Sequence, residues 1–185
     1  MSIIALLGPH AVGKSTAADR WLVRYGSLGL VVVHCDNSRI VTATGSTTQK
    51  GWSGSTEEKQ SLARVCAASP LIHVLEGNTA RNIPWLKAVP VVAIIHATCN
   101  WEQFSVFMQS RCAAKGKKYR EDYWDSKKLE YEAHQRLHNA VHNYGICSPI
   151  ADFMIEDQTA DWHRVDEHFS QLFRQLHNKN VRGHR

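Results

Sequence analysis

The sequence predicts an α/β domain of three layers, in which helices cover both faces of a five-stranded, mainly parallel sheet. Five short apolar runs alternate along the chain with longer stretches in which apolar residues recur every three or four positions. The first run leads through a glycine-rich loop directly into a helical stretch, an arrangement typical of parallel sheets with crossover helices. One domain spanning residues 1–185 accounts for the whole pattern.

Composition limits the class of protein. With 185 residues, 43% of them hydrophobic, the chain can bury a full-sized core. The first apolar run lacks the basic flank of a signal peptide and no run approaches the roughly 20 residues of a membrane span, so a cytoplasmic location is expected. The five cysteines form no C-x-x-C pair, which argues against a disulfide scaffold. A net charge of +5 favours an anionic partner.

Continuous apolar runs identify the five strands, because strands buried on both faces of a sheet show no polar alternation. They cover residues 3–7, 30–35, 71–75, 91–96 and 151–155. After the second strand, the stretch 37–55 is mostly Ser, Thr and Gly and includes Trp52. A loop of this length is interpreted as a substrate-binding insert.

Apolar residues at spacings of three and four identify the helices, and a capping box of Ser55 and Glu58 begins one of them. Val65 and Leu129 are among the side chains expected to face the core. Helices are expected from the glycine-rich loop to residue 25, over 56–68, from about 84, from 101, over 126–144 and over 160–177, followed by a basic, frayed tail at 178–185.

The loop after the first strand matches G-x-x-x-x-G-K-[ST] in full. It reads Gly8-Pro9-His10-Ala11-Val12-Gly13-Lys14-Ser15-Thr16. Its glycines let successive N–H groups face a phosphate, and the following helix adds the positive end of its dipole. Lys14 is expected to reach the β- and γ-phosphates, and Ser15 to hold Mg²⁺. The sequence therefore predicts a nucleotide site formed by these residues, with ATP and Mg²⁺ as cofactors.

Two acidic residues follow the second and third strands, at the sheet edge where ligands of α/β domains bind. Asp36 is placed to accept a proton from an acceptor hydroxyl, and Arg39 to hold an acceptor phosphate. The alternative for this pair is a helix N-cap with a surface arginine. Glu76 is placed to bind Mg²⁺, directly or through water, or the acceptor. Either acid is a candidate general base.

Basic residues gather after the fourth strand and its helix. They are Arg111, Lys115, Lys117, Lys118 and Arg120. A solvated basic face is the usual explanation of such a run. Because this run belongs to a predicted phosphate-binding protein, residues 111–125 are interpreted as a mobile lid, in which Arg111 and Lys115 neutralise the transferred phosphate.

These motifs resemble those of the P-loop kinases, and among them the polynucleotide 5′-hydroxyl kinases. The resemblance rests on the glycine-rich loop, on D-N-S-R at 36–39, on E-G-N-T-A-R at 76–81 and on R-C-A-A-K-G at 111–116. It implies that Asp36 is the general base, that Arg39 contacts an acceptor phosphate, and that Arg111 and Lys115 grip the donor phosphates. Glu76 and Lys115 depart from the aspartate and arginine commoner in that family.

The chain also resembles phage kinases that phosphorylate 5-hydroxymethyluracil within DNA. Such an enzyme has to take the base out of the stack to reach its hydroxyl. Trp52 in the 37–55 loop and the lid aromatics Tyr119, Tyr123 and Trp124 would suit stacking on a base, although ordinary packing explains them equally well. DNA or another polynucleotide is thus the expected acceptor.

Other functions remain compatible with the same motifs. A deoxynucleoside monophosphate kinase would bind its acceptor through Arg39 and Arg81, and a kinase of a small metabolite is a second alternative. A regulatory GTPase needs N-K-x-D to read guanine, whereas the N-K-N-V at 178–181 lacks the aspartate.

Three histidines, His134, His138 and His142, repeat every four residues on one predicted helix, a spacing that can place two of them on one metal ion. No acid or cysteine cluster joins them in the sequence. A polar flank of the packed helix is therefore expected at these positions instead of a metal site.

Overall fold

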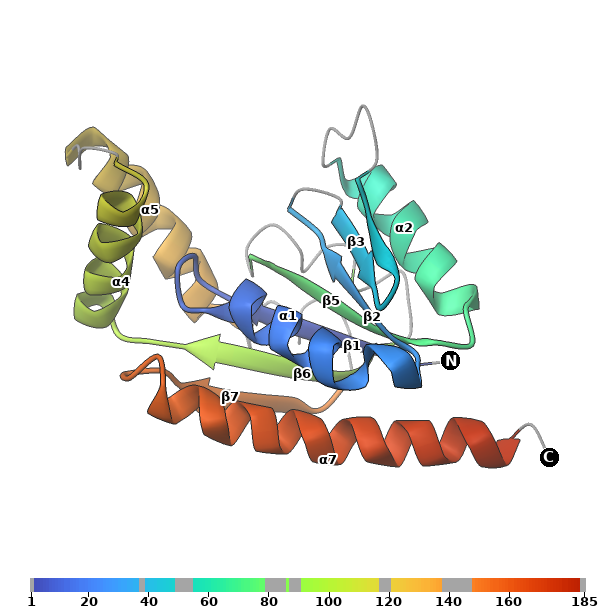
Figure 1. Ribbon diagram of the computed structural model, residues 1–185. Helices are drawn as coiled ribbons and strands as arrows, with labels where there is room; N and C mark the ends of the chain where they lie inside the picture. The colour runs from blue at the N-terminus through green and yellow to red at the C-terminus, as the bar shows by residue number, and fades with distance from the viewer. Residues whose placement is uncertain are drawn as a thin grey trace.

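A computed structural model describes residues 2–36, 39–48, 55–78, 86, 91–116, 121–137 and 148–183. The strands are β1 (Ser2–Gly8), β2 (Leu30–His34), β3 (Arg39–Thr42), β4 (Gly45–Thr48), β5 (Ile72–Asn78), β6 (Val91–Thr98) and β7 (Ile150–Met154). They form one mixed sheet in the order β4-β3-β2-β5-β1-β6-β7 (Figure 1). The five neighbouring strands β2, β5, β1, β6 and β7 run parallel to one another. At one edge of the sheet, β3 pairs antiparallel with β2, and β4 pairs antiparallel with β3.

The predicted α/β class and the five parallel strands are confirmed, but the total of five strands is wrong. The additional strands β3 and β4 lie inside the stretch 37–55 that was expected to be a loop. The sequence Arg39–Thr42 supplies the β-branched residues Ile40 and Val41, which pair with Val33 and Val32 of β2. Polar residues and Gly45 at the start of β4 leave the rest of the hairpin without an apolar strand pattern. Trp52 lies outside the described residues.

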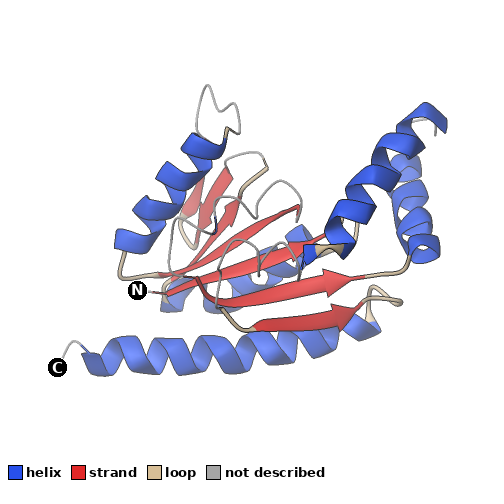
Figure 2. Cartoon of the chain, turned by 180° about the vertical axis from the view of Figure 1, so that it is seen from behind, coloured by secondary structure: helices blue, strands red, loops and turns tan. Residues whose placement is uncertain are grey.

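Helices cover both faces of the sheet. The helices α1 (Lys14–Tyr25) and α7 (Ala160–Gly183) pack on one face, and α2 (Thr56–Ala68) packs on the other (Figure 1). Beyond the end of β6, α4 (Trp101–Ala114) and α5 (Glu121–Gln135) lie side by side (Figure 2). A short 3-10 helix, η1 (Gly26–Leu28), follows α1. In the described part of the chain, no helix combines the length and hydrophobicity needed to cross a membrane.

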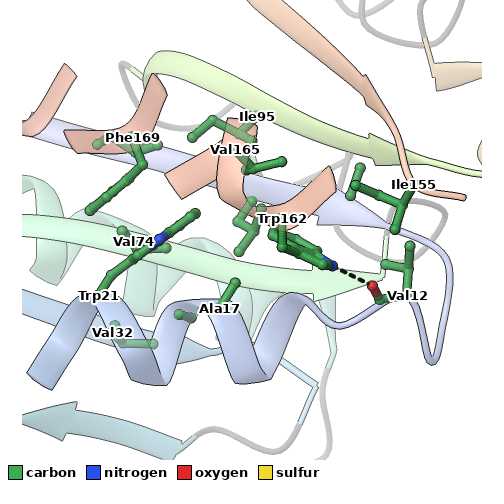
Figure 3. Close-up of a cluster of buried hydrophobic side chains, with 14 of the residues drawn as sticks. Val12, Ala17, Trp21, Val32, Val74, Ile95, Ile155, Trp162, Val165 and Phe169 are labelled. Carbon is green, nitrogen blue, oxygen red and sulfur yellow. Dashed lines mark hydrogen bonds between the residues drawn. The ribbon is translucent and has the colours of Figure 1, made fainter. Parts of the chain in front are cut away.

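Alternate side chains of β1 enter two separate cores, as the two-residue period of a strand requires. Ile4 and Leu6 join the core beneath α1 and α7, whereas Ile3 and Leu7 join the core beneath α2. In the first core the rings of Trp21 from α1 and Phe169 from α7 stack with their centroids 3.8 Å apart (Figure 3). The aromatic pair fixes the two helices against each other above the sheet.

Several helix predictions need correction. The C-terminal helix α7 continues to Gly183, so residues 178–183 are helical and not a frayed tail. The helix α5 begins at Glu121, five residues earlier than expected.

Two side chains that were expected to face the core are exposed. Leu129 is 69% exposed because it lies five residues, about 140° around the helix, from the buried His134. Val65 is 67% exposed, since smaller side chains turn α2 toward the sheet. They are Ala63, Cys66 and Ala67.

Three polar side chains form a hydrogen-bonded chain between α5 and the two strands at the edge of the sheet. His96 Nδ1 lies 2.7 Å from Asp152 Oδ1, and His96 Nε2 lies 3.1 Å from His134 Nδ1. His134 is fully buried, so this histidine belongs to the packed side of α5. His138 and His142 lie outside the described residues. Burial, with the nearby charges of His96 and Lys14, lowers the pKa of His134 to about 2.

This buried histidine predicts that the fold is weakened by acid. The folded pKa of His134 is far below the usual 6.5, so the unfolded chain binds a proton that the folded chain excludes. Stability is fully present above pH 6.5 and should fall by about 1.4 kcal/mol per pH unit below it. His134→Asn keeps a donor toward His96 but has no group to protonate, so its free energy of unfolding should fall with decreasing pH by about 1.4 kcal/mol per pH unit less than that of the wild type. Urea denaturation at pH 7, 6, 5 and 4 measures the free energy of unfolding of both proteins.

The matched control is His163→Asn, which alters an exposed histidine on α7. This variant should keep the wild-type dependence of stability on pH. An acid dependence that is the same in all three proteins would contradict the assignment to His134.

Candidate active site

A cavity of about 460 Å³ lies at the carboxyl edge of the parallel strands, where β1, β2 and β5 end. From the glycine-rich loop it is lined by His10, Ala11, Gly13, Lys14, Ser15 and Thr16. From the strand ends, α4 and the turn before α7 it is lined by His34, Asp36, Glu76, Phe107, Ser110, Arg111 and Gln158. The cavity therefore brings together Lys14, Ser15, Asp36, Glu76 and Arg111, which the sequence analysis proposed separately.

Three residues of the glycine-rich loop support the cavity without lining it. Val12 is fully buried in the core beneath α1 and α7. At Gly8 a Cβ atom would lie 2.5 Å from the carbonyl oxygen of Ala97, so only glycine fits against β6. The carbonyl oxygen of Pro9 accepts a 2.7 Å hydrogen bond from Lys14 Nζ.

The other predicted residues lie around the cavity or outside the described chain. Arg39 begins β3 and is paired with His34 across the antiparallel ladder, so it flanks the cavity without lining it. Lys115 is exposed at the end of α4, one turn beyond Arg111, and is not among the described lining residues. Arg81 lies outside the described residues, as do 117–120 of the predicted lid and the side chains at 121–125.

Side chains from the turn before α7 and from the first turn of α7 hold the backbone of the glycine-rich loop. Trp162 Nε1 donates to the carbonyl oxygen of Val12 at 2.8 Å (Figure 3), and Gln158 Nε2 donates to that of Ala11 at 2.6 Å. These bonds pair two carbonyl groups of the loop with side-chain donors and so fix its backbone. Gly13 has a left-handed φ of 105°, which turns the chain into α1. The loop geometry thus suits an anion at the beginning of α1.

The nucleotide site predicted from the sequence implies that Gly13→Ala weakens ATP binding at least tenfold while the chain remains folded. A Cβ atom at Gly13 would lie 2.7 Å from Trp162 Nε1, so the loop or the indole has to move. Calorimetric titration with ATP measures the affinity, and urea denaturation measures the fold. Gly29→Ala is the matched control, because Gly29 also has a left-handed φ, of 92°, but meets only Leu71 at 3.3 Å. Equal affinities in the two variants would contradict the role given to the loop.

Glu76 is the centre of the polar network in the cavity. Its Oε2 accepts a hydrogen bond from Ser15 Oγ at 3.2 Å and lies 2.9 Å from His34 Nδ1, and its Oε1 lies 3.8 Å from Lys14 Nζ. Burial raises the pKa of Glu76, but the hydrogen bond from His34 and the charge of Lys14 outweigh burial and lower it. The carboxylate therefore stays ionised at neutral pH.

Ser15 and Glu76 are suitable ligands for Mg²⁺. Both offer oxygen atoms, which Mg²⁺ prefers, and the two side chains are within 3.2 Å of each other at the cavity wall. No group of three or more metal-ligating His, Cys, Asp or Glu side chains occurs in the part of the chain that the structure describes. Such a donor set suits an ion that keeps water molecules and shares phosphate oxygens with a nucleotide.

Asp36 lies beyond the end of β2 and is held toward the cavity by the backbone. Its Oδ2 accepts a 3.2 Å hydrogen bond from the N–H of Asn78 at the end of β5. The alternative that Asp36 caps a helix is wrong, because the next described element is the strand β3, which begins at Arg39. Asp36 is thus positioned on the strand edge where a substrate hydroxyl could approach.

Sequence analysis missed four residues of the cavity wall: His34, Phe107, Ser110 and Gln158. The only sequence signal for His34 was its place at the end of an apolar strand, two residues before Asp36. An aromatic residue such as Phe107 in an apolar helical pattern indicates core packing, and Phe107 is indeed only 8% exposed. Gln158 reaches the loop across 147 sequence positions, and no local pattern indicates such a contact.

No protein-family model matches the chain, and no curated protein shows significant similarity to its sequence. The geometry of the cavity, together with the motifs that line it, is therefore the basis for assigning a function.

Proposed function

We propose that this chain is an ATP-dependent phosphotransferase with a P-loop NTPase fold, which moves the γ-phosphate to a hydroxyl group on nucleic acid. The convergence of Lys14, Ser15, Glu76 and Asp36 on one cavity carries the proposal. Lys14 and Ser15 are the residues of the G-x-x-x-x-G-K-[ST] motif that bind phosphates and Mg²⁺. Glu76 contributes an acid from β5 beside Ser15, and Asp36 contributes a carboxylate beyond the end of β2.

The donor phosphates are assigned to the glycine-rich loop and Lys14, with Arg111 approaching from α4. Ser15 and Glu76 would hold Mg²⁺, which neutralises charge on the phosphate oxygens when it is bound. Phosphoryl transfer depends mainly on positioning and on stabilising charge, so a preformed set of cations and N–H donors accounts for most of the expected rate enhancement.

Between the two candidate bases, the contacts favour Asp36. Both oxygens of Glu76 face groups of the nucleotide site, namely Ser15, His34 and Lys14. Asp36 instead lies on the cavity wall beyond these contacts. The Asp36 carboxylate takes the proton of the acceptor hydroxyl while the new oxygen–phosphorus bond forms. The bond between the γ-phosphorus and the oxygen that bridges to the β-phosphate breaks, and that oxygen leaves as part of ADP.

A nucleic acid is the acceptor that the net charge of +5 and the resemblance to polynucleotide kinases support best. The acceptor hydroxyl is then that of 5-hydroxymethyluracil in phage DNA or of a polynucleotide 5′ end. The protein would act in the cytoplasm, that of the host cell if a phage encodes it. Arg39 beside the cavity also fits a deoxynucleoside monophosphate, whose kinase is the competing function.

Transfer of labelled γ-phosphate from ATP, with Mg²⁺, tests the proposal. Three acceptors are compared in parallel: DNA with a 5′-hydroxyl, DNA that contains 5-hydroxymethyluracil, and mixed deoxynucleoside monophosphates. Label in either DNA supports the nucleic-acid kinase, and digestion then locates the label at the end or on the base. Label only in the free nucleotides indicates the competing function, and no transfer to any of the three contradicts the nucleic-acid proposal.

The dependence of acceptor binding on salt provides a second measurement. A DNA acceptor should bind more weakly as salt rises, because phosphate contacts release counterions from the duplex. An affinity for DNA that does not change between 50 and 200 mM salt would contradict recognition of the nucleic-acid backbone.

A further inference from the structure

We propose that His34 is a positioning residue, whose buried imidazole sets the orientation of the Glu76 carboxylate and thereby the affinity of the site for the metal–nucleotide complex. The inference rests on the proposed function, because it assigns Glu76 to the metal. It concerns a residue that belongs to none of the motifs of the sequence.

His34 and Glu76 are directly opposite each other on the neighbouring parallel strands β2 and β5. His34 Nδ1 lies 2.9 Å from Glu76 Oε2, and His34 Nε2 lies 3.3 Å from Asp19 Oδ1 on α1. His34 and Glu76 are 5% and 6% exposed. A hydrogen-bonded chain therefore runs from Asp19 through His34 and Glu76 to Ser15, and it joins α1 to two strands.

The two oxygens of Glu76 have different neighbours, so the rotation of the carboxylate matters. Oε2 receives the hydrogen bonds from His34 and Ser15, while Oε1 remains 3.8 Å from Lys14 Nζ. A bond from the imidazole to Oε2 opposes rotation of the carboxylate toward the ammonium. Without that bond, the attraction between two buried opposite charges favours a closer Glu76–Lys14 pair. Such a pair would draw both groups away from the phosphates and the metal ion.

Burial lowers the pKa of His34, but the hydrogen bond to Glu76 and the charges of Glu76 and Asp19 raise it overall. The imidazole is thus held by acidic partners on both sides, which restricts its ring orientation. Groups that orient a metal ligand in this way usually change metal affinity by about 10- to 100-fold when they are removed.

Two substitutions separate the two hydrogen bonds of the imidazole. His34→Asn keeps an N–H donor near the position of Nδ1, toward Glu76, and loses the bond to Asp19. His34→Gln places its amide farther from the backbone, near the position of Nε2, and loses the bond to Glu76. His96→Gln is the matched control, since His96 is also buried and bonded to a carboxylate, Asp152 at 2.7 Å, but does not line the described cavity.

Binding of Mn²⁺ in the presence of a non-hydrolysable ATP analogue, followed by electron paramagnetic resonance, is the main readout. We expect His34→Gln to weaken Mn²⁺ affinity by about 10- to 100-fold and His34→Asn to stay within about threefold of wild type. His96→Gln should lower stability in urea without changing Mn²⁺ affinity. In steady-state assays, the KM for Mg²⁺ of His34→Gln should rise more than its kcat falls.

The inference is overturned if His34→Gln binds Mn²⁺ as tightly as the wild type does. It is also overturned if the loss of Mn²⁺ affinity is proportional to the loss of stability in His34→Gln, His34→Asn and His96→Gln alike. Failure of the proposed function gives a different result, in which the wild-type chain neither binds the Mn²⁺–nucleotide complex nor transfers phosphate. Wild-type binding and transfer together with unaffected His34 variants would contradict the positioning role alone.

Discussion

Replacing Lys14 with alanine is expected to lower the rate of phosphate transfer by about 10²- to 10³-fold while the chain stays folded. The Lys14 side chain is 6% exposed, and its ammonium group donates to the carbonyl oxygen of Pro9 and lies 3.8 Å from Glu76 Oε1. It is therefore a fixed positive charge at the wall of the cavity, where the donor phosphates are proposed to bind. Because charge develops on the transferred group, its loss should reduce kcat as well as affinity for ATP. Initial rates over a range of ATP concentrations separate the two effects.

Lys115→Ala is the matched control for this experiment. Lys115 was expected to grip the phosphates from the lid, but it is exposed beyond the end of α4 and does not line the described cavity. Its removal should change kcat by less than about threefold, as for a solvated surface charge. Retained turnover in Lys14→Ala would refute the proposed phosphotransferase site. A large loss in Lys115→Ala would show that the lid closes on the nucleotide during turnover.

Asp36→Asn should lower kcat by about 10²- to 10⁴-fold, the usual contribution of a general base. The amide has the shape of the carboxylate and an oxygen that can accept the 3.2 Å bond from the N–H of Asn78, but it cannot take a proton. The KM for ATP should remain close to the wild-type value, since the donor phosphates are assigned to other residues. Steady-state kinetics with the acceptor identified by the labelling experiment provides both constants.

Asp166→Asn controls for the loss of a carboxylate elsewhere. Asp166 pairs with Arg20 and accepts from Trp21 between α1 and α7, and it does not line the described cavity. Its variant should lose stability and keep kcat. If Asp36→Asn keeps its kcat, Asp36 is not the base, and the comparison is repeated with Glu76→Gln.

The centre of the sheet could be predicted because β1, β2, β5 and most of β6 are buried on both faces. A continuous apolar run such as residues 3–7 has few alternatives to a buried strand, and the structure confirms all five runs as strands. The hairpin of β3 and β4 could not be predicted in the same way. Strand β4 is exposed along its whole length and consists of Gly, Ser and Thr, so its pairing with β3 leaves no hydrophobic pattern in the sequence.

The candidate site was predictable where a local motif defines it and not where distant segments meet. Lys14 and Ser15 follow from the spacing of one loop, and Asp36 and Glu76 from their places at strand ends. The role of His34 depends on the register between β2 and β5, which brings it opposite Glu76 across 42 positions. A histidine at the end of an apolar run is usually a core residue, so the sequence alone gave no reason to prefer the site.

The contacts between α7 and the glycine-rich loop have a consequence for biosynthesis. The loop occupies the beginning of the chain, yet Gln158 and Trp162, which hold its carbonyl groups, lie 147 and 150 positions later. During translation the first helix and strand can form early, but the loop cannot reach its final geometry until α7 has left the ribosome. For the proposed nucleotide site this implies that a nascent chain that ends before residue 158 does not bind ATP tightly.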